Sequence, residues 1–275
     1  MGAIFGLLGA LLIGISDLFG RRVVARSSAT TAAAAMQFVA IFAGLASMSI
    51  VPSEFIWRDF CIGAVAGLGT GTGLACYYGG VKRSSSTVVA PFVATLSSII
   101  PFSYTLITGA QPSLIAIIGS VLAFGGLVLV TMGGGDQTIH IPTGIRWGLA
   151  SGIGYGVGLT FLIEVSAASG SWSAVSQRVL SFVLLILVAR HYSLPATPPA
   201  GVRSAALVAG VFACATSIMY LLGVQADAAT AVITFSMFPA FSVVIGRIFF
   251  RDPVSRLQTA GIATVLAGVA GVVGG

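Results

Sequence analysis

A few charged residues lie inside long apolar stretches of the chain, where their chemistry is costly to maintain. The clearest is Arg178, in the segment SWSAVSQRVLSF. An ionised group within a membrane span is expected to have a function, because burying its charge in lipid is unfavourable. The Arg178 guanidinium could hold the carboxylate of a solute in a cavity. The alternative is a buried ion pair with Glu164, which lies near the end of the preceding apolar stretch.

Two further polar groups lie at depth in the first half of the chain. Gln37, in AAAAMQFVA, occupies a depth that matches that of Arg178 in its own stretch. Its amide can hydrogen-bond either a solute or a neighbouring helix. Asp17 precedes Arg21 by four residues, so the two side chains share a helix face and can pair near the membrane surface. Alternatively, the Asp17 carboxylate binds a proton or an amine.

Prolines and tyrosines add candidates for the wall of a cavity. Pro91 and Pro101 are predicted to interrupt one apolar stretch and Pro239 another, because proline removes a backbone hydrogen bond. The freed carbonyl groups need a partner, which is either a water-lined cavity or a neighbouring helix. Tyrosine suits a pocket for amphipathic solutes, since its ring is apolar and its hydroxyl polar. The tyrosines considered are Tyr77, Tyr78, Tyr104, Tyr155 and Tyr220.

No residues have the spacing of a metal site or of a catalytic constellation. The three cysteines lie in apolar stretches, and the two histidines lie near predicted loops. The glycine-rich segments 67–73 and 148–158 lack the lysine and the preceding strand of a phosphate-binding loop. Their small residues favour close helix packing instead. We therefore expect no enzymatic activity, no metal and no cofactor.

Composition defines the environment of these residues. Hydrophobic residues make up 57% of the 275 residues and charged residues only 7%. Soluble domains carry about 25% charge, and so few charges cannot cover the surface of a soluble fold. The composition excludes a soluble enzyme, a disordered chain and a nucleic-acid-binding protein. It predicts an all-α polytopic membrane protein.

Apolar stretches fill nearly the whole chain, and each is close to the length of about 20 residues that a membrane helix needs. Charges, prolines and polar clusters separate ten of them. The predicted spans are 3–20, 30–51, 60–79, 86–108, 113–133, 145–167, 172–191, 203–224, 228–250 and 257–274. Trp57, Trp147 and Trp172 fall at the ends of these spans, as expected for an interfacial aromatic belt.

An internal repeat relates residues 1–135 to residues 136–275. A shift of 142 or 143 residues brings tyrosines and glycines into register: Tyr77/Tyr220, Gly80/Gly223, Gly119/Gly261 and Gly126/Gly268. Each half contains five predicted spans, so the second half must enter the membrane upside down. Inverted repeats are characteristic of secondary transporters, whose substrate site lies between the halves. The matched tyrosines Tyr77 and Tyr220 lie near helix ends that are predicted to be cytoplasmic, and are alternatively gate or belt residues.

The positive charges are unevenly distributed between the two sets of helix ends. Eleven basic residues share one set, and Arg58 alone lies at the other. The eleven are Arg21, Arg22, Arg26, Lys82, Arg83, Arg146, Arg190, Arg203, Arg247, Arg251 and Arg256. Because Lys and Arg collect in cytoplasmic loops, this distribution predicts that both termini lie outside, in a bacterial-type inner membrane.

The chain resembles the EamA-type ten-helix carriers of the drug/metabolite transporter superfamily. The resemblance rests on the layout of two five-span halves, on the segment 73–102 (GLACYYGGVKRSSSTVVAPFVATLSSIIPF) and on SMFPAF at 236–241. It implies export of amino acids or other small metabolites, with a possible coupling proton. The turn TGAQPS at 108–113 lacks the acidic residue that the family often has there, whereas Asp252 keeps the acid in the second half. Many relatives place both termini in the cytoplasm, in conflict with the charge distribution.

These observations together predict a secondary transporter for a small carboxylated or zwitterionic solute. Alternating access between two inverted halves is the expected mechanism, and efflux the expected direction. The alternative is an uncoupled facilitator or channel, although the sequence contains no recognisable selectivity filter. The expected partners are the small-molecule substrate, the lipid bilayer and a coupling proton, in a monomer or a homodimer. No nucleic acid is expected.

Overall fold

A computed structural model describes residues 1–84, 86–132, 141–245, 248 and 255–274 of the chain. Within these ranges the ordered elements are helices, joined by short connections. The first five helices are α1 (Gly2–Arg26), α2 (Ala29–Ser47), α3 (Trp57–Arg83), α4 (Ser86–Ile107) and α5 (Leu114–Met132). The others are α6 (Ile141–Ile163), α7 (Trp172–His191), α8 (Arg203–Phe235), α9 (Phe238–Ile245) and α10 (Arg256–Gly274), with short 3₁₀ turns η1 (Ala167–Ser169) and η2 (Ala200–Val202).

Among the residues that the structure describes, six of these helices are long and apolar enough to cross a membrane. They are Gly2–Arg26, Ala29–Ser47, Trp57–Arg83, Val88–Ile107, Trp172–His191 and Ala200–Phe235, and the apolar helix Leu114–Val130 is shorter. A helix rises about 1.5 Å per residue, so about 20 residues match a hydrocarbon core about 30 Å thick. The protein is therefore a multi-pass membrane protein.

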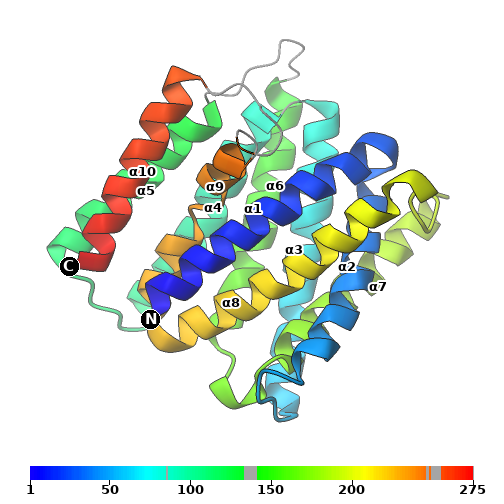
Figure 1. Cartoon of the computed structure of the whole chain (residues 1–275), viewed down its shortest axis with the longest axis horizontal. Helices are drawn as coiled ribbons and strands as arrows, with labels where there is room; N and C mark the ends of the chain where they lie inside the picture. The colour runs from blue at the N-terminus through cyan, green and yellow to red at the C-terminus, as the bar shows by residue number, and fades with distance from the viewer. Residues whose placement is uncertain (85, 133–140, 246–247, 249–254, 275) are drawn as a thin grey trace.

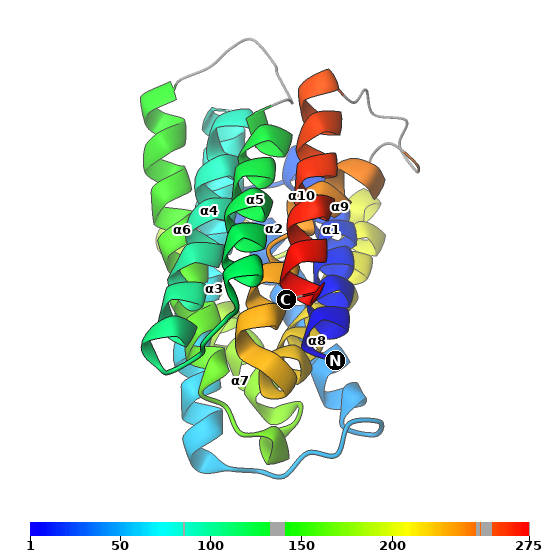
Figure 2. The ribbon, with the colours of Figure 1, turned by 90° about the vertical axis from the view of Figure 1, so that its left-hand side faces the viewer.

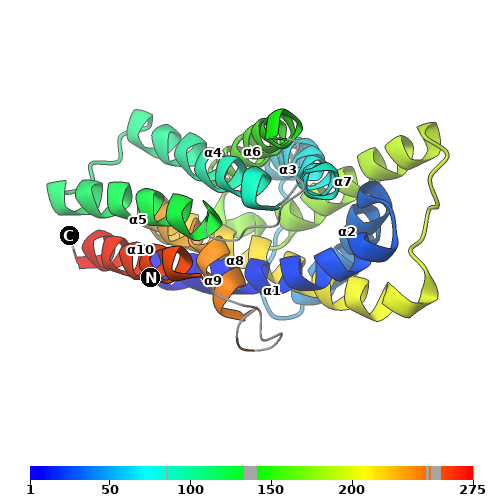
Figure 3. The same cartoon turned by 90° about the horizontal axis from the view of Figure 1, so that it is seen from above.

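The helices pack as a bundle in which α1 lies along α8 and α5 lies along α10 (Figure 1). Helix α3 contacts both α6 and α7, α2 contacts both α7 and α8, and α4 packs on α6. From above, α3, α4 and α6 lie on one side of the bundle, and α1, α8, α9 and α10 lie on the other (Figure 3). Helices from both halves of the sequence therefore alternate around the centre.

The two ends of the bundle differ in charge. One end, called here the charge-rich face, includes the ends of α1 and α3, which are joined by a bond from Lys82 Nζ to the Ser27 carbonyl at 3.0 Å. Figure 2 places the first residues of α6 and α10 at one end of the bundle, and the termini toward the other. At that opposite face, the Glu54 amide bonds to the Ala168 carbonyl at 2.8 Å. Two of the eleven basic residues, Arg247 and Arg251, lie outside the described residues.

Helix α8 contains the boundary that the sequence predicts between the spans 203–224 and 228–250. Asp227 interrupts the helix with an extended backbone, at φ −166° and ψ 102°. Its carboxylate accepts a bond from the Thr230 amide at 3.1 Å and another from the Thr230 hydroxyl. Asp227 thus acts as an N-cap for the segment that follows. Helix α8 ends at Phe235, and α9 begins at Phe238, one residue before Pro239.

Proline affects the two predicted spans differently. Helix α4 runs from Ser86 to Ile107, so Pro91 and Pro101 do not end the helix, and its residues Val93 and Ser97 line a central cavity. A proline inside a helix removes one hydrogen bond, and the surrounding turns can remain helical. The side chains of Pro91 and Pro239 lie outside the described set, so the structure does not place them relative to a cavity.

Glycines let several helices approach closely. A Cβ atom added at Gly126 of α5 would lie 2.8 Å from the carbonyl oxygen of Gly261 on α10, and one added at Gly261 would lie 2.7 Å from that of Gly126. Gly69 and Gly154 face each other between α3 and α6 in the same way. Any larger residue would push these backbones apart, so the glycine-rich segments 67–73 and 148–158 serve helix packing as predicted.

Candidate functional site

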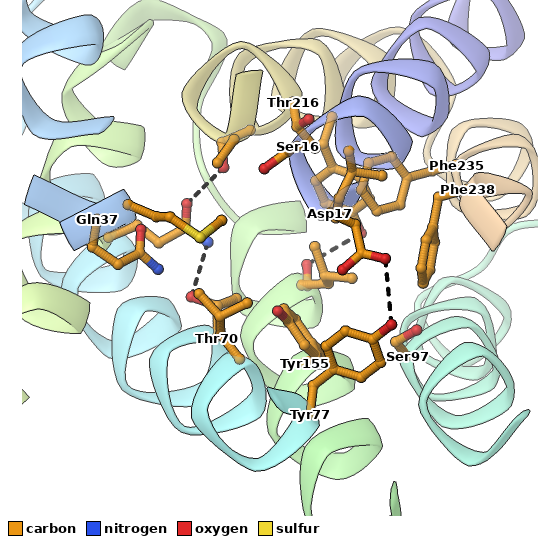
Figure 4. A pocket seen from close by; sticks show the side chains of 18 of the residues that line it. Ser16, Asp17, Gln37, Thr70, Tyr77, Ser97, Tyr155, Thr216, Phe235 and Phe238 are labelled. Atoms are coloured by element: carbon orange, nitrogen blue, oxygen red, sulfur yellow. Dashed lines mark hydrogen bonds between the residues drawn. The ribbon is translucent and has the colours of Figure 1, made fainter. Parts of the chain in front are cut away.

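A central cavity of about 90 Å³ lies between helices of both halves (Figure 4). Its walls come from α1, α2, α3 and α4 in the first half and from α6, α7, α8 and α9 in the second. Apolar and aromatic side chains form most of the lining, and polar groups gather in two clusters. The candidate residues from the sequence that line this cavity are Asp17, Gln37, Tyr77, Tyr78, Tyr155, Arg178 and Tyr220.

The first cluster surrounds Arg178 on α7, whose side chain is 8% exposed. One terminal nitrogen donates to Gln37 Oε1 on α2 at 3.0 Å. The other donates to the Ala213 carbonyl at 2.6 Å and to the Ser217 hydroxyl, both on α8. The Nε of Arg178 is buried without a hydrogen-bond partner. The guanidinium is therefore held in place by neutral groups and keeps one donor unused.

A chain of neutral polar side chains extends this cluster across the cavity. The Ser217 hydroxyl donates to Gln177 Oε1 at 2.9 Å, and Gln177 Nε2 donates to the Thr70 hydroxyl at 3.3 Å. The sequence analysis did not select Gln177, Ser217 or Thr70 as site residues. Gln177 lies directly beside Arg178 in the sequence, which was the available signal, whereas an isolated serine or threonine is common in membrane helices.

Arg178 forms no ion pair with any residue that the structure describes. The predicted alternative of a pair with Glu164 is wrong. Helix α6 ends at Ile163, so Glu164 lies at the opposite face, where it is exposed and lies 3.7 Å from Arg58 Nη2. Burial of an unpaired charge is costly. The arrangement around Arg178 is therefore suited to receive an anion from the cavity.

The second cluster joins α1 to α3 near the charge-rich face. Arg21 Nη2 lies 2.8 Å from Asp17 Oδ2 and donates to the Tyr77 hydroxyl at 2.7 Å. The Tyr77 hydroxyl in turn donates to Asp17 Oδ2 at 3.3 Å, as Figure 4 shows. The predicted pairing of Asp17 with Arg21 is present. Asp17 is buried, and these two partners satisfy one of its carboxylate oxygens.

Three of the other tyrosines have different surroundings. Tyr78 is buried, with its hydroxyl 3.8 Å from the sulfur of Met36. Tyr155 lies against Gly73, whose missing side chain leaves room for the ring. Tyr104 does not line the cavity, because it donates to Glu164 Oε1 at 2.6 Å near the opposite face. The structure thus brings Tyr78 and Tyr155 to the site and leaves Tyr104 and Glu164 outside it.

Asp59 is a fully buried acid that the sequence analysis missed. It accepts bonds from the Ser166 amide at 3.0 Å and from the Ser166 hydroxyl, and lies 3.2 Å from Arg58 Nη1. These contacts tie the first turn of α3 to the connection after α6 at the opposite face. Asp59 therefore stabilises that connection and does not face the cavity. Among the described residues, no three His, Cys, Asp or Glu side chains gather as metal ligands.

Comparison with known family models tests the resemblance that the sequence suggests. Residues 1–132, which contain α1 to α5, match the model of the EamA-like transporter family. The resemblance inferred from the sequence is thereby confirmed. The EamA-like family implies a membrane transporter of the drug/metabolite superfamily, whose members are not enzymes.

The fold of the whole chain also matches a solved structure. A crystal structure superposes with a TM-score of 0.78, covering 98% of this chain and 95% of the other at 15% identity. At that identity the likeness shows the fold alone. No curated protein matches the sequence significantly.

Proposed function

We propose that the protein is a secondary carrier that exports a small carboxylated or zwitterionic solute across a bacterial-type inner membrane. Arg178 carries this proposal, because its buried guanidinium faces the cavity with neutral partners and an unused Nε donor. Arginine presents donors in a planar fork that fits a carboxylate. In this arrangement Gln37 and Ser217 orient the fork, and the solute supplies the missing negative charge.

The packing of the helices supports an arrangement of two related five-helix halves, 1–135 and 136–275. In the proposed repeat, each helix of the first half corresponds to the helix numbered five higher in the second half. The contact between α1 and α8 then corresponds to the contact between α6 and α3, and both are present. The contact between α1 and α9 likewise corresponds to that between α6 and α4, and both are present. The pairs α2–α7 and α5–α10 each consist of two corresponding helices, and the helices of each pair are in contact. A twofold relation between inverted halves produces this pattern.

Two tyrosines support alternating access between these halves. Tyr77 on α3 bonds to Asp17 on α1, and its repeat equivalent Tyr220 on α8 donates to the Leu159 carbonyl on α6 at 3.2 Å. Each bond ties the first helix of a half to its third helix. Tyr77 lies toward the charge-rich face and Tyr220 toward the opposite face, and both line the cavity. Opening one tyrosine contact at a time would expose the cavity to one side only.

Asp17 supports a role for a proton or an amine in the transport cycle. Its carboxylate lines the same cavity as Arg178 and is held by Arg21 and Tyr77. A proton or a substrate ammonium that neutralises Asp17 would weaken its attraction for Arg21. The contact between α1 and α3 would then loosen on the side of the charge-rich face.

Counterflow into proteoliposomes tests the carrier proposal. Vesicles preloaded with one unlabelled amino acid or short carboxylic acid are assayed for uptake of the same compound in labelled form, across a panel. A carrier shows uptake accelerated by the internal substrate, whereas an uncoupled facilitator or channel does not. If no compound in the panel gives acceleration, the proposal of a secondary carrier fails.

The Arg178→Gln variant tests the carboxylate site within that assay. We expect it to lose affinity for every carboxylated substrate that the wild type carries, whereas Arg178→Lys keeps part of it. Arg58→Gln is the matched control, because it also removes one positive charge but lies at the exposed opposite face. Unchanged affinity in Arg178→Gln would rule out the proposed role of this residue.

A further inference from the structure

A second hollow lies on the outside of the bundle, away from the central cavity. It occupies about 590 Å³ between the last turns of α1 and the start of α8, at the charge-rich face. Helix α1 contributes Phe19, Arg22, Ala25 and Arg26 to its lining. Because residues three and four apart share a helix face, these side chains form one continuous wall.

The hollow combines two cations with an apolar floor. Arg22 and Arg26 are four residues apart and both exposed. The guanidinium of Arg22 lies over the Phe19 ring, 5.3 Å from its centroid, which holds the charge above the hollow. The other wall consists of Gly201, Val202, Ser204, Ala205 and Val208. None of these described lining residues is acidic.

The position of the hollow limits what can occupy it. It lies where the apolar spans α1 and α8 meet the membrane surface, so an occupant has its polar part at headgroup depth and its apolar part beside the helices. A free phosphate ion would match the arginines but leave the half-buried Ala205 and Val208 uncovered. A phospholipid has a phosphate for the arginines and an acyl chain for the apolar wall.

We propose that this hollow binds the headgroup of an anionic phospholipid, with Arg22 and Arg26 holding its phosphate. Arginine pairs with phosphate through parallel hydrogen bonds, and basic pockets between membrane helices bind anionic headgroups. The Ser204 hydroxyl offers a further polar partner, and the first acyl carbons lie against Val208. The site is separate from the transport cavity and does not depend on the identity of the substrate.

Native mass spectrometry of the full chain tests the site by titration with phosphatidylglycerol and, in parallel, with phosphatidylcholine of the same acyl chains. We expect phosphatidylglycerol to bind more tightly. Each arginine near a membrane surface contributes about 1 kcal/mol to attraction of an anionic lipid, or about fivefold in affinity. The variant Arg22→Gln/Arg26→Gln should therefore lose about 30-fold if the two effects add.

The matched control is Arg146→Gln/Arg256→Gln, which removes two exposed arginines outside the hollow. An equal loss in this control would show that only the overall charge matters, and would overturn the site. Equal binding of phosphatidylcholine would also overturn it. The variant Ala205→Leu fills the hollow without changing its charge. It should weaken the binding of phosphatidylglycerol and leave the binding of phosphatidylcholine unchanged. Competition by inorganic phosphate as strong as that by phosphatidylglycerol would assign the arginines to a free anion instead.

Discussion

Arg178 donates to Gln37 across 3.0 Å, and the two residues occupy matching depths in α7 and α2. In the proposed repeat these two helices are each other's counterparts, and they are in contact. The pair therefore lies where a twofold relation between the halves would place its axis. One position carries a permanent cation and its counterpart a neutral amide, so the centre of the cavity is positively charged on one side only.

The Gln37→Glu variant tests how much of the site depends on this asymmetry. A carboxylate at this position would pair with Arg178 inside the cavity and occupy the place of a substrate carboxylate. We expect a higher Tm of the purified protein and a large loss of counterflow for carboxylated solutes. Gln37→Leu should instead cost about 1–3 kcal/mol of stability, because it leaves a buried donor without its acceptor. Undiminished transport in Gln37→Glu would contradict the placement of the substrate beside Arg178.

Much of the architecture could be predicted because hydropathy and charge report directly on the membrane. Six of the ten predicted spans coincide with helices long and apolar enough to cross a membrane, among the described residues. The burial of Arg178 and the pairing of Asp17 with Arg21 also follow from local patterns. The hydrogen-bond partners of Arg178 cannot be predicted from local patterns, because they depend on which helices pack together. Arg178 lies six residues after the start of α7 at Trp172, roughly 9 Å along the helix axis, whereas Glu164 lies outside α7 and pairs with Arg58.

Neutral polar residues were the other part that the sequence could not reveal. Thr70 can bond to the carbonyl of Ala66 within its own helix, at 3.1 Å. Such a residue is therefore tolerated at any position around a membrane helix, and its type does not distinguish a cavity wall from a lipid-facing surface. Only the packing of α3 against α7 shows that Thr70 contacts Gln177.

Asp17→Asn should separate substrate exchange from proton coupling. The variant removes the charge that holds Arg21 but leaves an amide that can still accept from Tyr77. We expect exchange of substrate between the two sides of the vesicle to continue, and accumulation driven by a pH gradient to be lost. Glu164→Gln is the control, since it removes an exposed acid at the other face. If Asp17→Asn accumulates substrate against a pH gradient as the wild type does, Asp17 is not the coupling site.

Tyr220→Phe should open the cavity toward the opposite face. The substitution removes the bond to the Leu159 carbonyl, worth about 1 kcal/mol, but keeps the ring that packs on Phe235. Access is measured with a membrane-impermeant maleimide on Thr216→Cys, in a background from which the native cysteines have been removed. We expect about fivefold faster labelling from that face, which corresponds to the lost hydrogen bond.

Two variants serve as comparisons for this labelling experiment. Tyr104→Phe removes a hydroxyl near the same face but outside the cavity, and should leave the labelling rate unchanged. Tyr77→Phe should accelerate labelling from the charge-rich face, because it breaks the contact with Asp17 and Arg21. Faster labelling from the same face in both tyrosine variants would contradict their assignment to opposite ends of the cavity.

Neighbouring glycines in α5 give a matched test of the packing between α5 and α10. A Cβ at Gly126 would lie 2.7 Å from the Val265 amide nitrogen and 2.8 Å from the Gly261 carbonyl oxygen, whereas one at Gly125 would meet no atom within 4 Å. Gly126→Ala should therefore force the two backbones apart and cost about 1–3 kcal/mol, which lowers the Tm measured in detergent. Gly125→Ala should leave the Tm unchanged or raise it, since alanine favours the helix by up to about 1 kcal/mol. Because α5 and α10 contribute nothing to the described cavity lining, substrate affinity should be unchanged in both variants. A Gly126→Ala variant as stable as Gly125→Ala would show that α5 and α10 do not pack as closely as described.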